Sequence, residues 1–559
     1  MSSGGYVMVS LLKRKKFDIW TCISLLILAF LLLFFVYPMI TLLREAIFIN
    51  GQFTLKAFNK FFSKSYYYST IGNSFIVSFF VTIICLGLGI PFSYFYSFYQ
   101  IKGKRLLFIL SLLCTMSAPF IGAYSWILLL GRSGVITQIF AKLGVDIGDI
   151  YGFKGILLVQ SMKLFPLVMI YMNGAFRNID NSLLEAAENY GCKGVKRLFK
   201  IILVLIMPTV LAASLLVFMR AFADFGTPML IGQGYKTFPV LIYDAFLGEN
   251  GSDFNFASAV SVIAIIITGL VFLFQKYVTE KFNFSLNSIN KVQAKPAKGV
   301  AGIFMHLYCY ILVLVALLPN VYIIYMSFRN YNNSVIQDGY SFNNYILAGK
   351  RMLSRAIGNT LLVSFFSLAI IIIIAVLLAY LVARKSSILN NTIDIISMLP
   401  YIMPGSVIGI ALIVGFNKSY FRLTGTLAIM VIALTIRRMP FTSRSATATM
   451  MQVPISAEEA AISLGASKLR TFTKVTVPMI TSGIVSGAVL SFASIVTEMS
   501  STVILYNNKT ITLTIGTYSN IVRGTTGVAA VFATVTTIFT IACMVLYILL
   551  SKNDESMSI

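Results

Sequence analysis

The chain has 559 residues, of which 58% are apolar and only 11% are charged, whereas soluble domains average about 25% charged residues. This composition excludes a soluble globular enzyme, a disordered chain and a fibrous repeat, and it indicates a polytopic membrane protein. The net charge of +25 is interpreted as membrane topology rather than nucleic-acid binding, because most basic residues lie between apolar runs.

Apolar runs predict about twelve transmembrane helices, since each crossing needs about 20 mostly apolar residues. The first run follows the basic residues Lys13 to Lys16 and is too long for a signal-peptide core, so we expect an uncleaved helix. The runs lie at 20–43, 73–97, 106–130, 155–176, 201–222, 256–277, 302–327, 359–383, 393–416, 425–448, 475–497 and 527–550. The expected fold class is therefore an all-α polytopic membrane protein.

The distribution of basic residues predicts the orientation and the division of the chain. Segments that face the cytoplasm when the N-terminus is inside hold the larger share of Lys and Arg, as the positive-inside rule requires. An even number of spans then places both termini in the cytoplasm, with the protein in the cell membrane. The polar stretch 279–299 predicts a cytoplasmic linker between a first half, 1–278, and a second half, 300–559.

The two halves resemble each other in sequence. Gly72-Asn73-Ser74 and Gly358-Asn359-Thr360 each open the second span of a half, where Asn is a favourable helix cap. Prolines recur in the third and fourth spans, at Pro119 and Pro404 and at Pro166 and Pro440. Six spans per repeat give both halves the same orientation, so a pseudo-two-fold axis along the membrane normal is expected, with a path at their interface.

Each half also carries one short motif in the polar loop between its fourth and fifth spans. The motif is Glu-Ala-Ala followed after three residues by Gly, and its members are Glu185, Ala186, Ala187 and Gly191, then Glu459, Ala460, Ala461 and Gly465. A Ser three positions before each Glu predicts a capping box at Ser182 and Ser456, and the Gly predicts the left-handed residue that ends a helix. We expect two short cytoplasmic helices that dock on a partner.

This motif resembles the coupling-helix motif of permease subunits of binding-protein-dependent ABC importers. In that family an apolar-x-apolar-Pro sequence follows the Gly, and the second half matches it at residues 475–478, whereas the first half has proline only at Pro208. The resemblance covers nearly the whole chain, as two fused permease domains. It implies that the eight motif residues couple the chain to a dimer of ABC ATPase subunits, and that an extracytoplasmic binding protein delivers the substrate.

The sequences that follow the two fifth spans, residues 222–228 with Asp224 and residues 497–500 with Glu498, are similar to those of the ferric-iron uptake permeases. This resemblance implies a permease subunit of an ATP-driven importer for ferric iron. Related permeases carry aminoethylphosphonate, thiamine or polyamines, and these substrates remain alternatives.

The sequence lacks the motifs of ATP hydrolysis and of metal binding. It contains no G-x-x-x-x-G-K-[ST] phosphate loop, so ATP hydrolysis is expected in a separate subunit and the chain is not expected to be an enzyme. The scattered cysteines and the single histidine, His306, lack metal-ligand spacing, so no metal site or cofactor is expected. A secondary transporter also fits two sets of six spans, but the loop 100–105 lacks the acidic residue that this class predicts. A channel would not need the duplicated inner helix.

Charged residues at membrane depth are candidate functional residues, because their burial in lipid is costly. They are Lys163, Arg220, Arg437 and Arg438, for which the alternative is snorkelling to an interface. Asp224 and Glu498 occupy equivalent positions just past the outer ends of the fifth spans. If they face each other across the outer mouth of a translocation path, a paired negative charge there favours a cation such as ferric iron or a polyamine. The alternative is local, with either carboxylate capping an outer helix.

Overall fold

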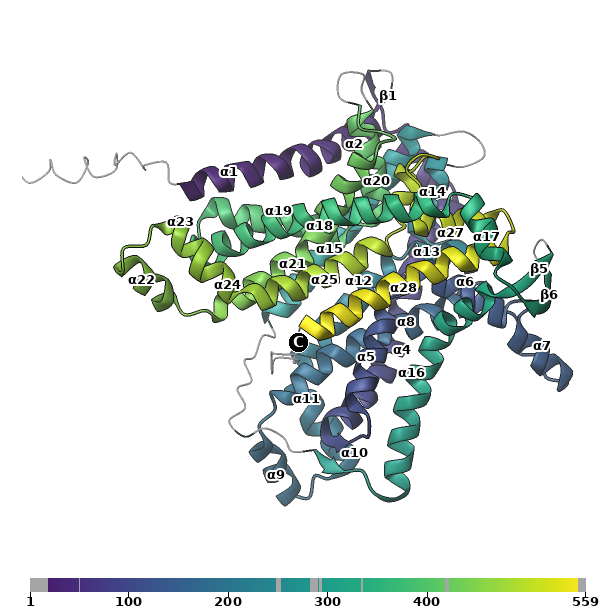
Figure 1. Cartoon of the computed structure of the whole chain (residues 1–559), viewed down its shortest axis with the longest axis horizontal. Coiled ribbons are helices and arrows are strands. Elements are labelled where there is room, and N and C mark those ends of the chain that lie inside the picture. The colour runs from purple at the N-terminus through teal and green to yellow at the C-terminus, as the bar shows by residue number, and fades with distance from the viewer. Residues whose placement is uncertain are drawn as a thin grey trace, which may run out of the picture.

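The computed structural model describes residues 19–49, 51–247, 253–281, 290, 294–332, 335–417 and 422–550, and these are mostly helical (Figure 1). The basic residues Lys13 to Lys16, most of the predicted linker and both ends of the chain lie outside the described residues. The expected positions of the termini therefore stay predictions.

The first half consists of helices, short π-helical segments labelled η, and three short strands. They are α1 Ile19–Leu31, η2 Leu32–Val36, α2 Tyr37–Ile47, β1 Phe48–Ile49, β2 Gln52–Phe53, α3 Lys56–Ser63, α4 Ser65–Phe98, β3 Tyr99–Gln100, α5 Lys104–Met116, α6 Pro119–Leu130, α7 Val135–Lys142, α8 Phe153–Arg177, α9 Asn181–Asn189, α10 Gly194–Arg197, η3 Leu198–Ile202, α11 Leu203–Leu205, α12 Met207–Phe222, α13 Gly226–Ile231, α14 Phe238–Leu247 and α15 Phe254–Lys281.

The second half repeats this order almost element by element. Its elements, with the preceding linker strand, are β4 Lys295–Pro296, α16 Gly299–Ser327, β5 Arg329–Asn332, β6 Val335–Tyr340, α17 Asn343–Lys350, α18 Leu353–Arg384, α19 Ile388–Ile402, α20 Gly405–Phe416, α21 Leu427–Gln452, α22 Ile455–Ser463, α23 Lys468–Thr471, η4 Phe472–Thr476, α24 Val477–Met479, α25 Thr481–Val496, α26 Thr502–Leu505, α27 Leu513–Val522 and α28 Thr526–Leu550. The strands pair only as β1 with β2, β3 with β4 and β5 with β6 among the described residues.

The helices confirm an all-α, multi-pass membrane architecture. Eight of those described are long and apolar enough to cross a membrane, and three bent pairs raise the number to as many as 11. The predicted run 425–448 forms α21, which contains three arginines and is not among these candidates. The count of about twelve spans therefore stays a prediction.

The third predicted span of each half is broken at its proline. Pro119 is the first residue of α6, after a two-residue break from α5. Pro404 precedes α20, and the axes of α19 and α20 differ by 111°. Proline at a helix start costs no hydrogen bond, whereas inside a helix it removes one. In the second half, the break therefore also changes the direction of the chain inside the bundle.

The fifth predicted span of each half is bent at equivalent isoleucines. Ile206 separates α11 from α12 with a bend of 75°, and Ile480 separates α24 from α25 with a bend of 68°. Pro208 follows the first bend and Pro478 precedes the second, so the position of the proline does not set the bend. The departure of the first half from the family pattern at this point therefore leaves the local structure unchanged.

The halves exchange their first helices. Helix α1 packs on α18 and α19, and α2 lies between α20 and α15 of its own half. Helix α16 packs on α4, α5 and α6 of the first half and on α28 of its own half. The Ser24 hydroxyl donates to Asn390 Oδ1 of α19 at 2.7 Å, and the Trp20 ring lies 4.3 Å from that of Tyr380, centroid to centroid. The boundary predicted at 279–299 divides the sequence, but in space each half is completed by a helix of the other.

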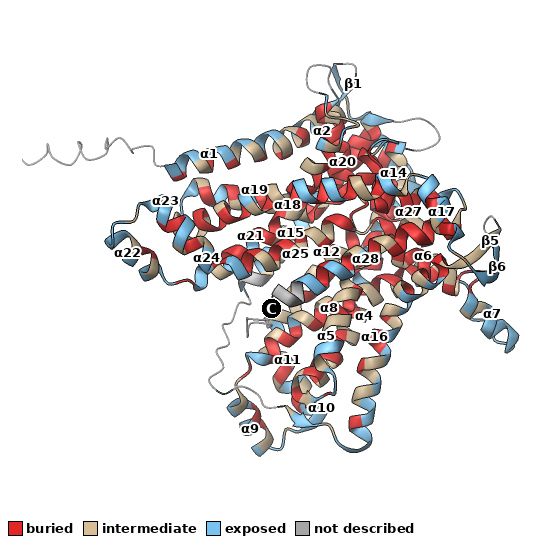
Figure 2. Ribbon diagram, in the orientation of Figure 1, coloured by how far each residue is buried: buried red, intermediate tan, exposed pale blue. Residues whose placement is uncertain are grey.

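Burial follows this arrangement. Figure 2 shows the buried residues concentrated where the two halves meet, around α6, α13, α20 and α27, whereas α7, α9 and α22 at the periphery are largely exposed. The outward face of α1 is also exposed. Exposed Leu, Ile and Phe side chains on a membrane helix face lipid rather than water.

The exchange of first helices predicts a specific cross-link. In a variant without the native cysteines, Ser24→Cys with Asn390→Cys should be joined by a short dithiol reagent. After cleavage at a protease site inserted in the linker, the two fragments should then stay together in denaturing electrophoresis. The control pair Ser24→Cys with Ser111→Cys, both in the first half, should not cross-link. A cross-link in the control pair alone would show that α1 packs on its own half.

Candidate functional site

The two Glu-Ala-Ala segments form helices α9 and α22, as expected, but their predicted caps are wrong. Helix α9 is capped by Asp180, whose carboxylate accepts from the Ser182 backbone N–H at 2.9 Å. Helix α22 starts after Pro454, without a side-chain cap. Proline's fixed backbone angle and the short Asp side chain thus start these helices one or two residues before Ser182 and Ser456.

Both helices end in the same way. Gly191 and Gly465 have φ of +77° and +88°, which confirms the predicted left-handed conformation. The N–H of Cys192 donates to the carbonyl of Ala187 at 2.8 Å, and that of Ala466 to the carbonyl of Ala461 at 3.0 Å. These bonds satisfy helix-end carbonyls as in a Schellman motif, so part of the Ala pair serves the turn itself.

The helices are anchored to the bundle by different interactions. Glu458 of α22 forms a buried ion pair with Arg384 at the end of α18, with Oε1 and Nε 2.9 Å apart. Arg384 also donates to the carbonyl of Val453 at 2.7 Å. The residue equivalent to Glu458 in α9 is Leu184, which is buried in an apolar cluster. Sequence reasoning missed this anchor because the Glu beside the motif looks like an ordinary surface charge.

Helix α9 is additionally held by the linker. Glu188 forms ion pairs with Lys295 of the linker at 3.4 Å and with Arg197 at 3.2 Å. The Lys295 charge lowers the pKa of Glu188 below its ordinary value, with a smaller contribution from Arg197. The backbone of Asn290 also accepts from the Asn181 N–H at 3.0 Å. The first of the two helices is thus tied to the segment that joins the halves.

Each helix presents a large apolar side chain immediately before its final Gly. Tyr190 is 93% exposed and Leu464 is 90% exposed, and the motif residues Glu185, Ala186, Glu459 and Ala460 are exposed beside them. Helices α9 and α22 lie at the far ends of two diverging groups of helices (Figure 1). Exposed apolar side chains next to small residues are suited to a docking surface.

A buried ion pair occupies the end of the fifth span in the second half. The Glu498 carboxylate contacts Arg437 of α21 directly and lies 3.8 Å from Arg438. It also accepts from the hydroxyls of Ser500 at 2.6 Å and Ser501 at 2.8 Å. Glu498 is only 3% exposed, so it is not the bare carboxylate of an acidic mouth.

The equivalent carboxylate of the first half has neutral partners. Asp224 accepts from the Gln160 amide at 3.1 Å and from the Gly226 N–H at 3.2 Å. Arg220, one turn before Asp224, donates instead to the Tyr401 hydroxyl, at 2.9 Å. The two carboxylates thus lie in different environments.

A tyrosine pair joins the halves at the end of the molecule away from α9 and α22. Tyr243 of α14 and Tyr518 of α27 are repeat equivalents, and their hydroxyls lie 3.3 Å apart. Figure 1 places α14 and α27 close together at that end. A contact between equivalent residues marks the pseudo-two-fold axis. Sequence reasoning missed it because two isolated tyrosines carry no motif.

Comparison with known families and proteins gives consistent matches. The family model described as "Binding-protein-dependent transport system inner membrane component" matches residues 371–557. This range contains α22, its Glu-Ala-Ala motif and Pro478, the part of the chain that follows the family pattern most fully.

Relatives match over one or both halves. The ferric transport system permease protein FbpB of Actinobacillus pleuropneumoniae is 25% identical over 560 residues, covering 98% of this chain and 80% of the relative. The 2-aminoethylphosphonate transport system permease protein PhnU of Salmonella typhimurium is 27% identical, covering 46% of this chain and 91% of the relative. The spermidine/putrescine transport system permease protein PotB of Haemophilus influenzae is 30% identical, covering 38% of this chain and 74% of the relative.

The left-handed glycines predict a first set of variants. A Cβ at Gly465 or Gly191 meets no atom within 4 Å, so a substitution acts through backbone strain, about 1–2 kcal/mol for a residue with a Cβ. Gly465→Val should reduce association with the ATPase by about 5–30-fold in co-purification, with Gly191→Val similar. Gly465→Asn, which tolerates this conformation, should retain association. Equal loss in the Val and Asn variants would argue against the backbone mechanism.

The two carboxylates predict unequal effects on stability. Glu498→Gln leaves buried arginines uncompensated, and breaking a buried pair in this way costs about 3–5 kcal/mol. Asp224→Asn weakens hydrogen bonds from neutral donors, about 1 kcal/mol, and removes a charge that interacts with Lys163 only at longer range. Thermal unfolding of the purified chain should therefore show a much larger decrease for Glu498→Gln, and adding Arg437→Gln should restore part of it. Equal decreases would mean that the ion pair does not stabilise the fold.

Proposed function

The chain belongs to the binding-protein-dependent transport system inner membrane component family, and we propose that within this family it carries ferric iron. It is the multi-pass permease subunit of an ABC importer and works with an ATPase and a substrate-binding protein. The iron assignment rests on one observation: the match to a ferric transport permease extends over 98% of this chain. Half-length relatives such as the phosphonate permease fit one domain of a fused pair.

The coupling proposal concerns helices α9 and α22. We propose that each docks on one subunit of an ATPase dimer through the exposed motif residues and the side chains of Tyr190 and Leu464. In this proposal the two helices and both termini lie in the cytoplasm. The ion pair between Arg384 and Glu458 makes α22 move with α18, so ATP-driven displacement of the ATPase is transmitted to the second half.

The path proposal concerns the region between the coupling helices and the tyrosine pair. We propose that the path follows the interface of halves 1–278 and 300–559, past Asp224 and Glu498, and that the contact of Tyr243 with Tyr518 closes its outer end. Glu498 borders this path as a neutralised residue, and Asp224 is the carboxylate with only neutral hydrogen-bond donors. Rocking of the halves would separate the tyrosines and open the outer end to the binding protein.

A second candidate substrate is 2-aminoethylphosphonate. The charged residues along the proposed path are four basic and two acidic, namely Lys163, Arg220, Arg437, Arg438, Asp224 and Glu498. This excess of positive charge favours an anion over a bare cation. It is the specific observation that keeps the phosphonate under consideration.

An uptake assay tests the assignment. Vesicles containing the chain with its ATPase, supplied with its binding protein, should accumulate radiolabelled ferric iron when ATP is enclosed, and no iron without ATP. Labelled 2-aminoethylphosphonate and spermidine, supplied in the same way, should not accumulate. Phosphonate uptake without iron uptake would replace the iron assignment, and accumulation driven by an ion gradient without the ATPase would contradict the importer mechanism.

A further inference from the structure

The basic residues at one repeat position behave differently in the two halves. Lys163 of α8 and Arg437 of α21 are equivalent, as are Asp224 and Glu498. Arg437 contacts Glu498 directly. Lys163 interacts with Asp224 only at longer range, and within the part of the chain that the structure describes it has no hydrogen bond or ion pair. The ion pair that Arg437 and Glu498 form in the second half is therefore not formed by Lys163 and Asp224 in the first half.

A difference in side-chain size explains this asymmetry. Gly405 follows Pro404, and a Cβ there would lie 2.6 Å from Arg437 Nη1 and 2.1 Å from Ser500 Oγ. The missing side chain is thus what lets the guanidinium reach Glu498. The equivalent residue of the first half is Phe120, which is fully buried, with its Cβ against Gly226. Phe120 fills the corresponding space and leaves Lys163 to extend elsewhere.

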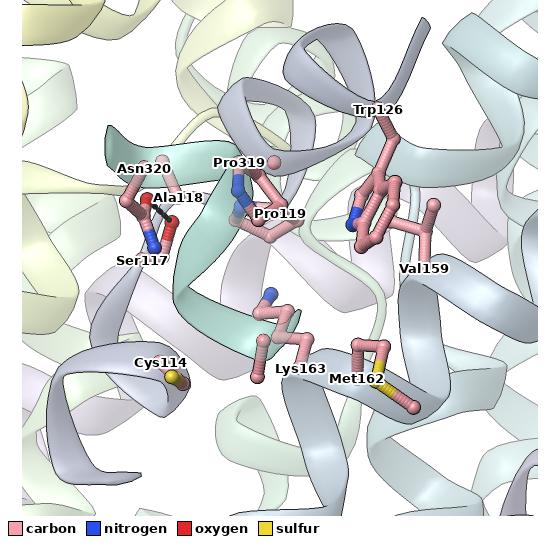
Figure 3. A pocket seen from close by; sticks show the side chains of 12 residues that line it. Cys114, Ser117, Ala118, Pro119, Trp126, Val159, Met162, Lys163, Pro319 and Asn320 are labelled. Atoms are coloured by element: carbon pink, nitrogen blue, oxygen red, sulfur yellow. Dashed lines mark hydrogen bonds between the residues drawn. The ribbon is translucent and has the colours of Figure 1, made fainter. Parts of the chain in front are cut away.

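Lys163 extends into a small cavity beside the broken third span. The cavity measures about 20 Å³ and is lined by the ends of α5 and α6, by α8 and by α16. Figure 3 shows the Lys163 nitrogen pointing toward Pro119 and the hydrogen-bonded pair of Ser117 and Asn320, with the indole nitrogen of Trp126 facing the same space. The Ser117 hydroxyl donates to Asn320 Oδ1 at 2.7 Å, which leaves the Asn320 amide N–H groups as donors.

The surroundings of the ammonium group are net positive. Besides Asp224, the charged groups that act on Lys163 are Arg220 and Arg438. Arg220 stacks on the rings of Tyr401 and Phe441 and leaves Asp224 to its neutral donors. An ammonium group at membrane depth needs a counter-charge. Glu498 lies 3.8 Å from Arg438 and contacts Arg437, so Asp224 is the carboxylate left for both Lys163 and Arg220.

We propose that Lys163, Trp126 and Asn320 form a binding site for one oxygen of a small oxyanion that travels with the cargo. The cavity has room for about one water-sized atom, so the rest of the anion lies outside it, in the path. The proposal rests on the proposed function in one respect, namely that the cargo is ferric iron. The net positive charge around Lys163 would repel a bare trivalent ion, so the iron passes this point bound to an oxyanion. A phosphonate would present the same oxygen chemistry directly.

Binding is tested without transport. The chain has 2 tryptophans, so in a Trp20→Phe variant the emission of Trp126 reports on the cavity alone. Titration of the purified protein with inorganic phosphate should change this emission saturably. Lys163→Met should raise the half-saturating concentration at least about tenfold, the effect of losing one charged hydrogen bond, and Lys163→Arg should restore part of the affinity. Lys142→Met, a change at an exposed lysine of α7, should leave the titration unchanged.

Transport then identifies the source of the anion. In the reconstituted system, ferric iron uptake by the wild type should increase with phosphate or bicarbonate, and Lys163→Met should lose that dependence. Uptake of 2-aminoethylphosphonate that needs Lys163, without iron uptake, would keep the anion site and refute the iron assignment. No phosphate-dependent emission change, an equal change in Lys163→Met, or iron uptake with the same anion dependence in both proteins would overturn the site.

Discussion

The compensation of charge inside the membrane is the constraint on which this structure depends. An ionised side chain in lipid is costly unless a partner of opposite charge or several hydrogen-bond donors surround it. The second half meets this constraint with a closed ion pair between Arg437 and Glu498, to which Ser500 and Ser501 add hydroxyl donors. That pair joins α21 to the end of α25 and lies against the start of α20, so the broken third span, the fourth span and the fifth span meet at one point.

The first half has the same helix breaks and bends, but its charged side chains make different contacts. Its third span breaks at the equivalent proline, and its fifth span bends at the equivalent isoleucine. Phe120 occupies the space that Gly405 leaves open, and Gly226 replaces Ser500, so the basic and acidic residues do not close into a pair. A homodimeric permease would have to place the same residues on both sides of its axis. A fused chain can instead hold a closed ion pair in one half and, as proposed above, an anion site in the other.

The sequence predicted the elements whose determinants are local. Runs of apolar residues located the candidate spans, and Gly191 and Gly465 marked the ends of helices α9 and α22 because few residues other than glycine adopt a positive φ readily. The caps were mispredicted because Asp180 and Pro454 compete with the serines that follow them. The exchange of α1 and α16 could not be predicted, since periodicity shows that a helix has a lipid-facing side but not which helices cover the other side.

The environments of the site residues could not be predicted either, because they depend on contacts between helices. Glu498 and Asp224 were found as charges at equivalent positions, yet their difference depends on Arg437, Gly405 and Phe120, which lie on other helices. The contact of Tyr243 with Tyr518 depends on the pseudo-two-fold axis and has no local signal. The sequence did show the internal repeat. The repeat identifies equivalent residues in the two halves, so that their different contacts can be compared.

The exchange of first helices also imposes an order on biosynthesis. Ser24 and its partner Asn390 are 366 residues apart, so at about 5–20 residues per second α1 waits in the membrane for roughly 20–70 s before α19 exists. Helix α16, by contrast, emerges when α5 and α6 are already in place. The Ser24 hydroxyl lies 2.9 Å from the carbonyl of Trp20 within its own helix. This carbonyl gives the polar group an acceptor during the wait, so a helix with a distant partner can stay in lipid without an unsatisfied hydroxyl.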